Sequence, residues 1–147
     1  MARIADVMGL KLISVRPDER VQVAIARMLE GNVGSVAVTE GGRLEGIFTE
    51  RDVLRLAGEG TQFGEVKIGD VMTRQLVTVA PDDDVLSAAR LMGERRIRHL
   101  PVVEGENVLG IVGIRDVMRT IVEIVWREHD ASARDTAREL LKRASPA

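Results

Sequence analysis

Apolar and polar positions follow each other along the first 120 residues in an order that occurs twice. Short β-branched runs at 12–15 and 76–79 predict strands. Each run is followed by a proline and an aspartate, Asp18 or Asp82, which we expect to cap a helix. Apolar residues then recur with the i, i+3, i+4, i+7 spacing of one helix face: Val21, Ala24, Ile25 and Met28 in the first copy, and Val85, Ala88, Ala89 and Met92 in the second.

Two pairs of strands are predicted next, each pair separated by a glycine-containing turn. The first pair covers 35–39 and 44–48, and the second covers 99–103 and 108–112, so both are predicted to be β-hairpins. A second helix is expected to begin at the Arg-Asp dipeptide that follows each hairpin. Each unit therefore has the predicted order β-α-β-β-α.

The two units are copies of one sequence. An offset of 64 residues aligns 6–55 with 70–119 without a gap, and 20 of the 50 aligned positions are identical. One pair of matching stretches is GIFTERDV, residues 46–53, and GIVGIRDV, residues 110–117. Such duplication is typical of a unit that cannot cover its own apolar face and packs against its copy.

These patterns divide the chain into four segments. We expect a first repeat at 4–57, a glycine-rich linker at 58–67, a second repeat at 68–122 and a C-terminal helical extension at 123–147. The helix after the second repeat has an apolar face broader than one core contact requires, and a further amphipathic piece with Ser132 as its expected cap follows it. This piece either folds back on its own chain or packs against another subunit.

Composition narrows the classes of function. Of the 147 residues 45% are hydrophobic and 30% charged, which is ordinary for a folded globular protein. A net charge of −2 and the low aromatic content, 2 Phe and 1 Trp, argue against nucleic-acid binding. Because there is no cysteine and only two histidines occur, 30 residues apart, we expect neither a metal site nor an enzyme. No signal sequence or membrane span is predicted, so we expect a cytoplasmic protein.

The duplicated unit resembles a known family. The stretches DVMT at 70–73 and RHLPVV at 98–103, with the repeated Gly-Ile-x-x-x-x-Asp-Val ending, are similar to a tandem pair of cystathionine β-synthase (CBS) domains, also called a Bateman module. The resemblance implies an α+β fold with pseudo-two-fold packing of the repeats. It also implies a homodimeric regulator that requires no cofactor, binds AMP, ADP, ATP or S-adenosylmethionine between its repeats, and controls a separate, unidentified target protein.

The corner at the end of the first hairpin has two interpretations. Thr49 followed three residues later by Asp52 is a capping-box pattern, which needs no ligand. In the second copy Gly113 replaces the threonine while Arg115 and Asp116 remain, which indicates a role for the acid beyond the cap. A carboxylate at a helix start can accept hydrogen bonds from both hydroxyls of a ribose, and the resemblance assigns this role to both aspartates. The missing hydroxyl predicts two inequivalent sites.

Further candidates surround these corners. Arg98 and His99 enter a strand at the position that faces the ligand in the family, and we expect them to contact phosphate, whereas the first copy has the uncharged Gly34 and Ser35 there. Four apolar residues are candidates either for an adenine pocket or for the ordinary core. The complete set of candidate ligand-binding residues is Val33, Ser35, Ile47, Thr49, Arg51, Asp52, Ile97, Arg98, His99, Ile111, Gly113, Arg115 and Asp116.

One other class of function stays open. The broad apolar face after the second repeat also fits a dimeric interaction module, or scaffold, whose clefts hold no ligand. A ligand that stabilises the protein against unfolding separates the two classes, because a scaffold would show no such effect.

Overall fold

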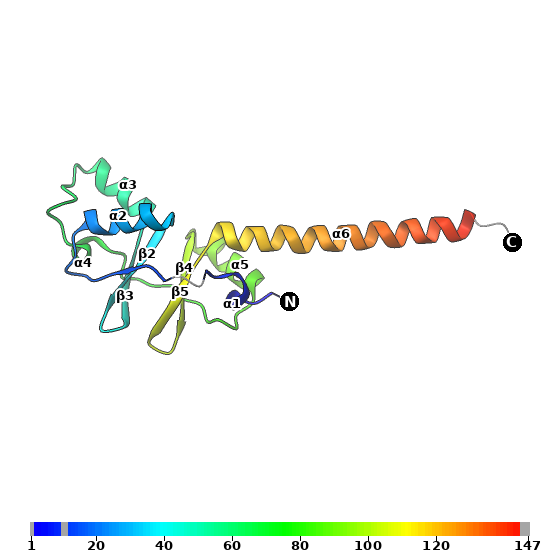
Figure 1. Cartoon of the computed structure of the whole chain (residues 1–147), viewed down its shortest axis with the longest axis horizontal. Coiled ribbons are helices and arrows are strands. Elements are labelled where there is room, and N and C mark those ends of the chain that lie inside the picture. The colour runs from blue at the N-terminus through cyan, green and yellow to red at the C-terminus, as the bar shows by residue number, and fades with distance from the viewer. Residues whose placement is uncertain (1, 10–11, 145–147) are drawn as a thin grey trace.

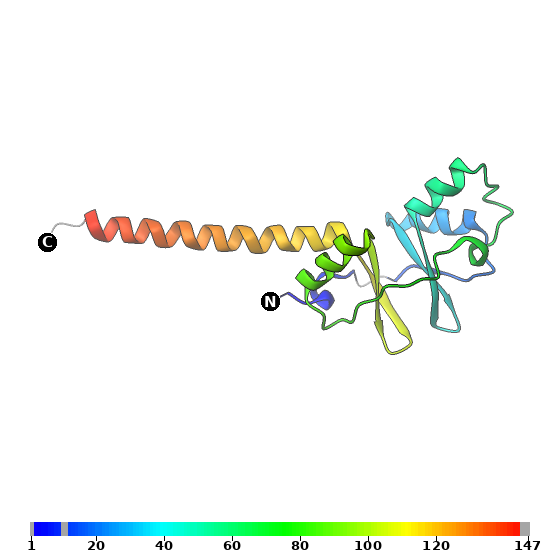
Figure 2. The same ribbon diagram turned by 180° about the vertical axis from the view of Figure 1, so that it is seen from behind.

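The computed structural model describes residues 2–9 and 12–144, and within them the chain is built around one five-stranded sheet (Figures 1 and 2). The strand order is β1-β2-β3-β5-β4. The predicted α+β class, with two repeats and a C-terminal helix, is confirmed. In chain order the elements are α1 (Ile4–Val7), β1 (Ser14–Val15), α2 (Val21–Gly31), β2 (Ser35–Glu40), β3 (Arg43–Thr49), α3 (Glu50–Gly58), α4 (Ile68–Val71), α5 (Val85–Arg95), β4 (His99–Glu104), β5 (Asn107–Gly113) and α6 (Ile114–Ala144).

Both predicted hairpins are present, with strands slightly longer than expected. β2 pairs with β3 and β4 pairs with β5, and each hairpin has a bulge at the same place, after Val38 and after Val102. The hairpins lie side by side and are joined by the antiparallel pair of Arg43 and Asn107 near their tips (Figure 1). The two copies of the sequence therefore build two copies of one structure within a single sheet.

The first strand of each unit is shorter than predicted. β1 has two residues and pairs in parallel with β2. In the second unit Val79 forms an isolated parallel bridge with Val102. Ile13 and Val77 nevertheless pack against the two cores, so the apolar runs that predicted these strands are explained by burial more than by strand pairing.

The predicted helix caps at Asp18 and Asp82 are wrong. α2 and α5 begin three residues later, and neither has a side-chain cap. The next residue of each copy closes a turn before the helix: a carboxylate oxygen of Glu19 accepts from the backbone N–H three residues earlier at 2.9 Å, and that of Asp83 does so at 2.8 Å. Glu19 and Asp83 are thereby used in the turns, so the free backbone N–H groups at the start of α2 and α5 need other acceptors.

Backbone carbonyls from distant segments provide these acceptors. The N–H of Val21, the first residue of α2, donates to the carbonyl oxygen of Val66 at 2.9 Å. The N–H of Val85, the first residue of α5, donates to the carbonyl oxygen of Ala2 at 3.1 Å. Both helix starts are therefore closed by the segment that precedes the other repeat.

This arrangement exchanges the short first helices between the repeats. Ile4 of α1 is fully buried in the core of the second hairpin, and Ile68 of α4 is fully buried in the core of the first. Their backbone N–H groups make equivalent hydrogen bonds of 2.8 Å, to the carbonyl oxygens of Asp83 and Glu19 respectively. Each hairpin is thus completed by an α-helix that belongs to the other copy of the sequence.

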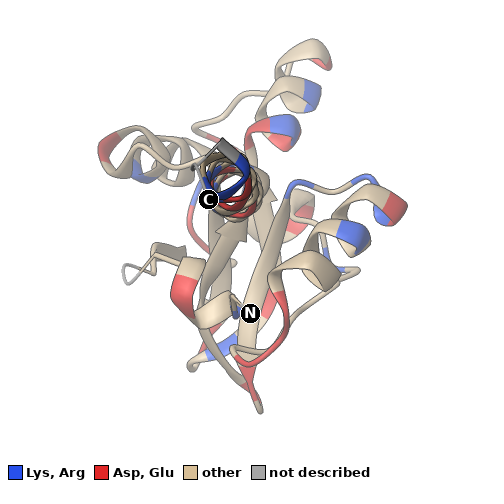
Figure 3. Cartoon of the chain, turned by 90° about the vertical axis from the view of Figure 1, so that its right-hand side faces the viewer, with Lys and Arg blue, Asp and Glu red and all other residues tan. Residues whose placement is uncertain are grey.

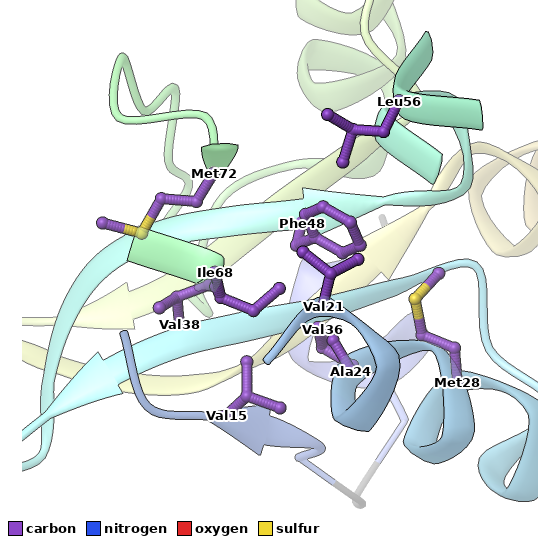
Figure 4. Packing of buried hydrophobic residues seen from close by; sticks show 10 residues of the cluster. All are labelled: Val15, Val21, Ala24, Met28, Val36, Val38, Phe48, Leu56, Ile68 and Met72. Atoms are coloured by element: carbon purple, nitrogen blue, oxygen red, sulfur yellow. The ribbon is translucent and has the colours of Figure 1, made fainter. Parts of the chain in front are cut away.

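The exchange divides the described chain into two lobes that differ from the two repeats. Residues 12–72 form the first lobe, and residues 2–9 together with 77–144 form the second. Figure 4 shows the core of the first lobe, in which Phe48 is surrounded by aliphatic side chains. The buried residues of this core are Val15, Val21, Ala24, Met28, Val36, Val38, Phe48, Leu56, Ile68 and Met72. Those of the second lobe are Ile4, Val79, Val85, Ala88, Met92, Leu100, Val102, Val112 and Val117.

Two glycines lie where the exchanged segments cross the hairpins. A Cβ atom at Gly46 would lie 2.6 Å from the sulfur of Met72 and 2.8 Å from the carbonyl oxygen of Thr73. A Cβ atom at Gly110 would lie 2.8 Å from Cε of Met8. At Gly46 the fixed backbone oxygen of Thr73 leaves no room for a side chain, so this glycine is explained by close packing rather than by a ligand. At Gly110 the near atom is the flexible end of Met8, which can shift.

The C-terminal extension is one helix and not two pieces. α6 runs without a break from Ile114 to Ala144, so the expected cap Ser132 lies in its interior. The sequence of this segment contains neither glycine nor proline, which is why no break occurs. Side chains 125–143 are exposed, and the helix projects away from both lobes instead of folding back (Figure 1).

Candidate functional site

Each hairpin ends in a sharp corner where its second strand runs directly into a helix. β3 ends at Thr49, β5 ends at Gly113, and the next helix begins one residue later in both cases. The N–H of that next residue donates to the carbonyl oxygen of Gly34 in the first corner, at 3.0 Å, and of Arg98 in the second, at 2.8 Å. The corners predicted from the repeat are therefore two equivalent helix starts.

The first corner forms the capping box that its sequence predicts. The N–H of Thr49 donates to Oδ2 of Asp52 at 2.9 Å, and the N–H of Asp52 donates to Oγ1 of Thr49 at 3.4 Å. Asp52 is 9% exposed, and its Oδ1 lies 3.6 Å from the guanidinium of Arg55. One carboxylate oxygen is thus used at the helix start, and Oδ1 is the atom better placed for a ligand.

The second corner leaves its carboxylate more accessible. Gly113 has no hydroxyl group, so it cannot form the side-chain half of a capping box. The Asp116 side chain is 42% exposed, and its Oδ1 lies 3.8 Å from the guanidinium of Arg119. A surface ion pair of this length contributes little, so Asp116 is the more available of the two predicted ribose-binding acids.

The imidazole of His99 lies between the two corners. His99 is directly opposite Gly113 in the β4–β5 pair, and a Cβ atom at Gly113 would lie 3.7 Å from its Cδ2 and 3.9 Å from Oδ2 of Asp116. A Cβ atom at Gly34, in the other lobe, would lie 3.1 Å from Nε2 of His99 and would collide with the Glu50 carboxylate. The His99 ring is therefore adjacent to one acidic residue at a helix start in each lobe, Glu50 in the first and Asp116 in the second.

Charges around His99 act on it in both directions. Burial is the largest influence and lowers the pKa of His99 below its usual value; Glu50 and Asp116 oppose this effect, while Arg98 and Arg115 reinforce it. Because the pKa is lowered, the ring is mostly neutral at pH 7 and offers a hydrogen-bond donor and acceptor rather than a positive charge.

The ring of His99 also accounts for the glycine in the second corner. The equivalent cross-strand pair in the first lobe is Ser35 with Thr49, a small residue facing a larger one. In the second lobe the sizes are reversed, because His99 faces Gly113. The glycine that departs from the predicted pattern is thus complementary in size to its neighbour, and the two corners differ in shape.

A double-mutant cycle tests this complementarity. We expect Gly113→Thr to destabilise the protein by about 1–3 kcal/mol, because the added atoms crowd the imidazole. In the His99→Ser background, which recreates the Ser35–Thr49 pair, the same change should cost at least about 1 kcal/mol less. Gly113→Ala is the control, since its Cβ would make only ordinary contacts. Urea unfolding measures the four free energies, and equal costs in both backgrounds would contradict the interpretation.

Six of the predicted site residues share one face of the sheet. Side chains alternate along a strand, so residues that flank the core positions point away from the helices. Ile47 is buried but belongs to neither helix-backed core, which places it on this second face. Four of the six form the cross-strand pairs Ser35–Thr49 and His99–Gly113. The other two, Ile47 and Ile111, lie two positions before Thr49 and Gly113 on the same strands.

The other predicted residues are more scattered. Val33 is 37% exposed before β2, whereas Ile97 packs partly against the core of the second lobe and is explained by that packing. Arg51, Arg98 and Arg115 are exposed, and the last two are near enough to His99 to lower its pKa. The structure therefore brings basic side chains to the second corner more clearly than to the first.

Sequence reasoning missed Glu50. This residue follows the hairpin of the first copy and corresponds to an apolar isoleucine in the second, so the repeat offered no second acid to draw attention to it. Its carboxylate lies beside Gly34 of the same lobe and acts on His99 across the boundary between the lobes. The one available signal was its place beside Thr49 at a helix start, where acids are also favoured for purely local reasons.

Two helix-backed hairpins with exchanged first helices and paired strand-to-helix corners define a duplicated α+β module. Residues 4–59 and 68–123 each match the model of the CBS domain. The chain therefore belongs to the CBS domain family and carries two such domains in tandem.

Two curated relatives are also named for CBS domains. Over 111 residues the chain is 41% identical to the CBS domain-containing protein CBSX3, mitochondrial, of Arabidopsis thaliana, a match that covers 71% of this chain and 54% of that protein. Over 118 residues it is 35% identical to the CBS domain-containing protein YhcV of Bacillus subtilis, covering 80% and 84%. The chain thus spans about half of the plant relative and most of the bacterial one.

Solved structures share the fold. A CBS-domain protein from Burkholderia ambifaria superposes with a TM-score of 0.78 at 27% identity, covering 83% of this chain and 95% of that one. The CBS domain pair of protein MJ0100 has a TM-score of 0.77 at 23% identity, covers 83% and 97%, and contains 5′-methylthioadenosine and S-adenosyl-L-methionine. PAE2072 from Pyrobaculum aerophilum, in complex with AMP, has a TM-score of 0.73 at 23% identity and covers 78% and 89%.

Neither a membrane-spanning helix nor a metal-binding cluster occurs among the described residues. Among residues 2–9 and 12–144, no helix combines the length and apolar character that crossing a membrane requires. The same described residues contain no cluster of three or more His, Cys, Asp or Glu side chains suited to a metal ion.

Proposed function

We propose that this protein is a regulatory module that binds an adenosine-containing ligand at its strand-to-helix corners and thereby controls a separate partner protein. The observation that carries the proposal is the second corner. There an accessible carboxylate, Asp116, lies at a helix start beside a residue without a side chain, Gly113. A ribose can approach such a corner closely and donate both of its hydroxyl groups to the carboxylate.

The surroundings suit the rest of a nucleotide. Arg98 and Arg115 are exposed near His99, where they provide positive charge for a phosphate group. The neutral imidazole provides a hydrogen bond without adding to that charge. Ile111 is partly exposed and provides apolar surface on this face of the sheet, where Ile47 lies buried. In this proposal His99 contributes to specificity, and the arginines contribute most of the attraction for phosphate.

Relatives of the same fold support the ligand class. The MJ0100 pair contains two adenosine compounds and PAE2072 contains AMP, so the fold is compatible with a bound adenosine. We assign no catalytic step to the chain, and in the proposal its regulatory effect passes through the partner.

Thermal unfolding with a panel of ligands tests the proposal. AMP, ADP, ATP, S-adenosylmethionine and NADH should be compared, and at a concentration 100 times its dissociation constant the preferred ligand should add about 2.7 kcal/mol of stability. The matched control is the 2′-deoxy form of the preferred nucleotide, or 2′-deoxyadenosine if the preferred ligand is S-adenosylmethionine, with adenosine as its reference. Loss of one ribose hydroxyl should weaken binding several-fold. Equal stabilisation by both forms would contradict ribose recognition at these corners.

The second candidate function is a ligand-free dimeric scaffold. The observation that favours it is the large exposed apolar surface of α6, most of which lies on the part of the helix that projects beyond the second corner (Figure 1). In that case no adenosine compound would change the unfolding temperature, and the oligomeric state would be the same with and without the panel.

A further inference from the structure

The long helix α6 carries an apolar stripe that no described part of the chain covers. Beyond Ile124 the side chains as far as Arg143 are exposed to solvent. A lone helix gains little stability in water, so most of the stability of a projecting helix must come from packing of an amphipathic face. The large apolar side chains of the stripe are Met118, Val122, Val125, Trp126 and Leu140, with exposed fractions of 49, 46, 58, 61 and 60%.

The stripe has a regular spacing. Val122 and Ala133, Trp126 and Ala137, and His129 and Leu140 are pairs separated by 11 residues. An 11-residue repeat corresponds to about 3.67 residues per turn, close to the value of an undistorted helix. The apolar positions therefore stay on one side along the whole projecting part. Figure 3 looks along α6 from its C-terminal end and shows both acidic and basic residues on this helix.

We propose that this stripe packs antiparallel against the same stripe of a second copy of the chain. With the two alanines included, the exposed side chains present roughly 600 Å² per chain, so two copies would bury about 1,200 Å² in total, the lower end of the range for stable interfaces. A second copy fits because it offers a straight stripe of the same length. The two stripes would form the interface of a homodimer whether or not a ligand is bound.

The distribution of side-chain sizes favours the antiparallel direction. Four of the five large residues lie in the first half of the stripe, and the two alanines lie in the second half with Leu140. A parallel pair would therefore oppose most of the large residues with one another and each alanine with an alanine. In an antiparallel pair centred near residue 131, Val125 faces Ala137 and Val122 faces Leu140 of the second copy. The same two-fold axis brings Asp130 beside Arg134 of the second copy twice, because both residues lie on the same flank of the stripe.

Sedimentation of the full chain provides the first test. The wild type should be a dimer, and Val122→Asp or Trp126→Asp should weaken dimerisation at least about 100-fold, since each buries a charge in the apolar contact. Arg127→Asp, outside the stripe, is the control and should remain dimeric. Because these positions are exposed in the single chain, the unfolding of the two lobes should change little. A monomeric wild type at about 100 μM, or stripe variants that dimerise like the wild type, would overturn the proposal.

Cross-linking tests the direction. The chain contains no cysteine, so Val122→Cys and Leu140→Cys each introduce a single thiol. These positions are about 27 Å apart along the helix. In the antiparallel dimer neither variant should form a disulfide alone, while an equimolar mixture should form the mixed one after oxidation. Rapid disulfide formation by each variant alone would indicate a parallel pair and overturn the proposed arrangement.

Discussion

The Ile4→Ala variant is expected to lose about 2–5 kcal/mol of its free energy of unfolding, the usual cost of removing a large buried aliphatic side chain. Ile4 belongs to α1, a helix of only four residues. Its side chain is nevertheless fully buried in the second lobe. Since small domains are stable by only about 5–15 kcal/mol in total, the loss should be plain in urea unfolding.

The matched variant is Ile68→Ala, the same position in the other copy. Amide hydrogen exchange distinguishes the two, because each isoleucine packs on the hairpin that its own repeat does not contain. Ile4→Ala should increase exchange first in β4 and β5, and Ile68→Ala should do so first in β2 and β3. Leu29→Ala, 77% exposed, serves as the surface control. Increased exchange in the opposite hairpin for either variant would disprove the exchange of the short helices.

The second large effect is expected on ligand binding. Asp116→Ala should weaken the preferred adenosine ligand roughly 10- to 100-fold, because two hydrogen bonds to a charged acceptor are lost. Its stability without ligand should change by less than about 0.5 kcal/mol, since the carboxylate is half exposed and makes only a long ion pair. Isothermal titration calorimetry measures the affinity, and urea unfolding measures the stability.

The Asp52→Ala variant distinguishes the role of this carboxylate in stability from its proposed role in ligand binding. This carboxylate completes the capping box of α3, so its loss should cost about 1 kcal/mol of stability whether or not a ligand is present. If both variants keep the wild-type affinity for every compound in the panel, the proposed function fails while the account of the cap still stands.

Much of the fold could be predicted because it depends on local patterns. The hairpins, the second helices and the pairing of the corners follow from alternation, helical spacing and the repeat itself. The capping box at Thr49 was also predictable, because it involves residues three positions apart. The exchange of α1 and α4 was not, since Ile4 and Ile68 are equivalent positions and would look the same if each packed on its own repeat.

The sequence predicted the two repeated aspartates of the candidate site but not the position of His99 between the lobes. Asp52 and Asp116 stand out because they are repeated, whereas Glu50 belongs to one copy only. That His99 lies between the two lobes depends on how the hairpins pack, which the sequence does not state. The caps assigned to Asp18 and Asp82 were wrong because distant carbonyl groups close those helices, and local sequence carries no signal of such partners.

The exchanged helices have a topological consequence for communication. The first lobe is one continuous stretch of chain inserted into the second, whose described residues precede it (2–9) and follow it (77–144). A protein fused on either side of this described module would therefore pull on the second lobe alone. Ligand binding at the first corner would therefore have to be coupled to α6 through the sheet and the His99 contact rather than along the backbone.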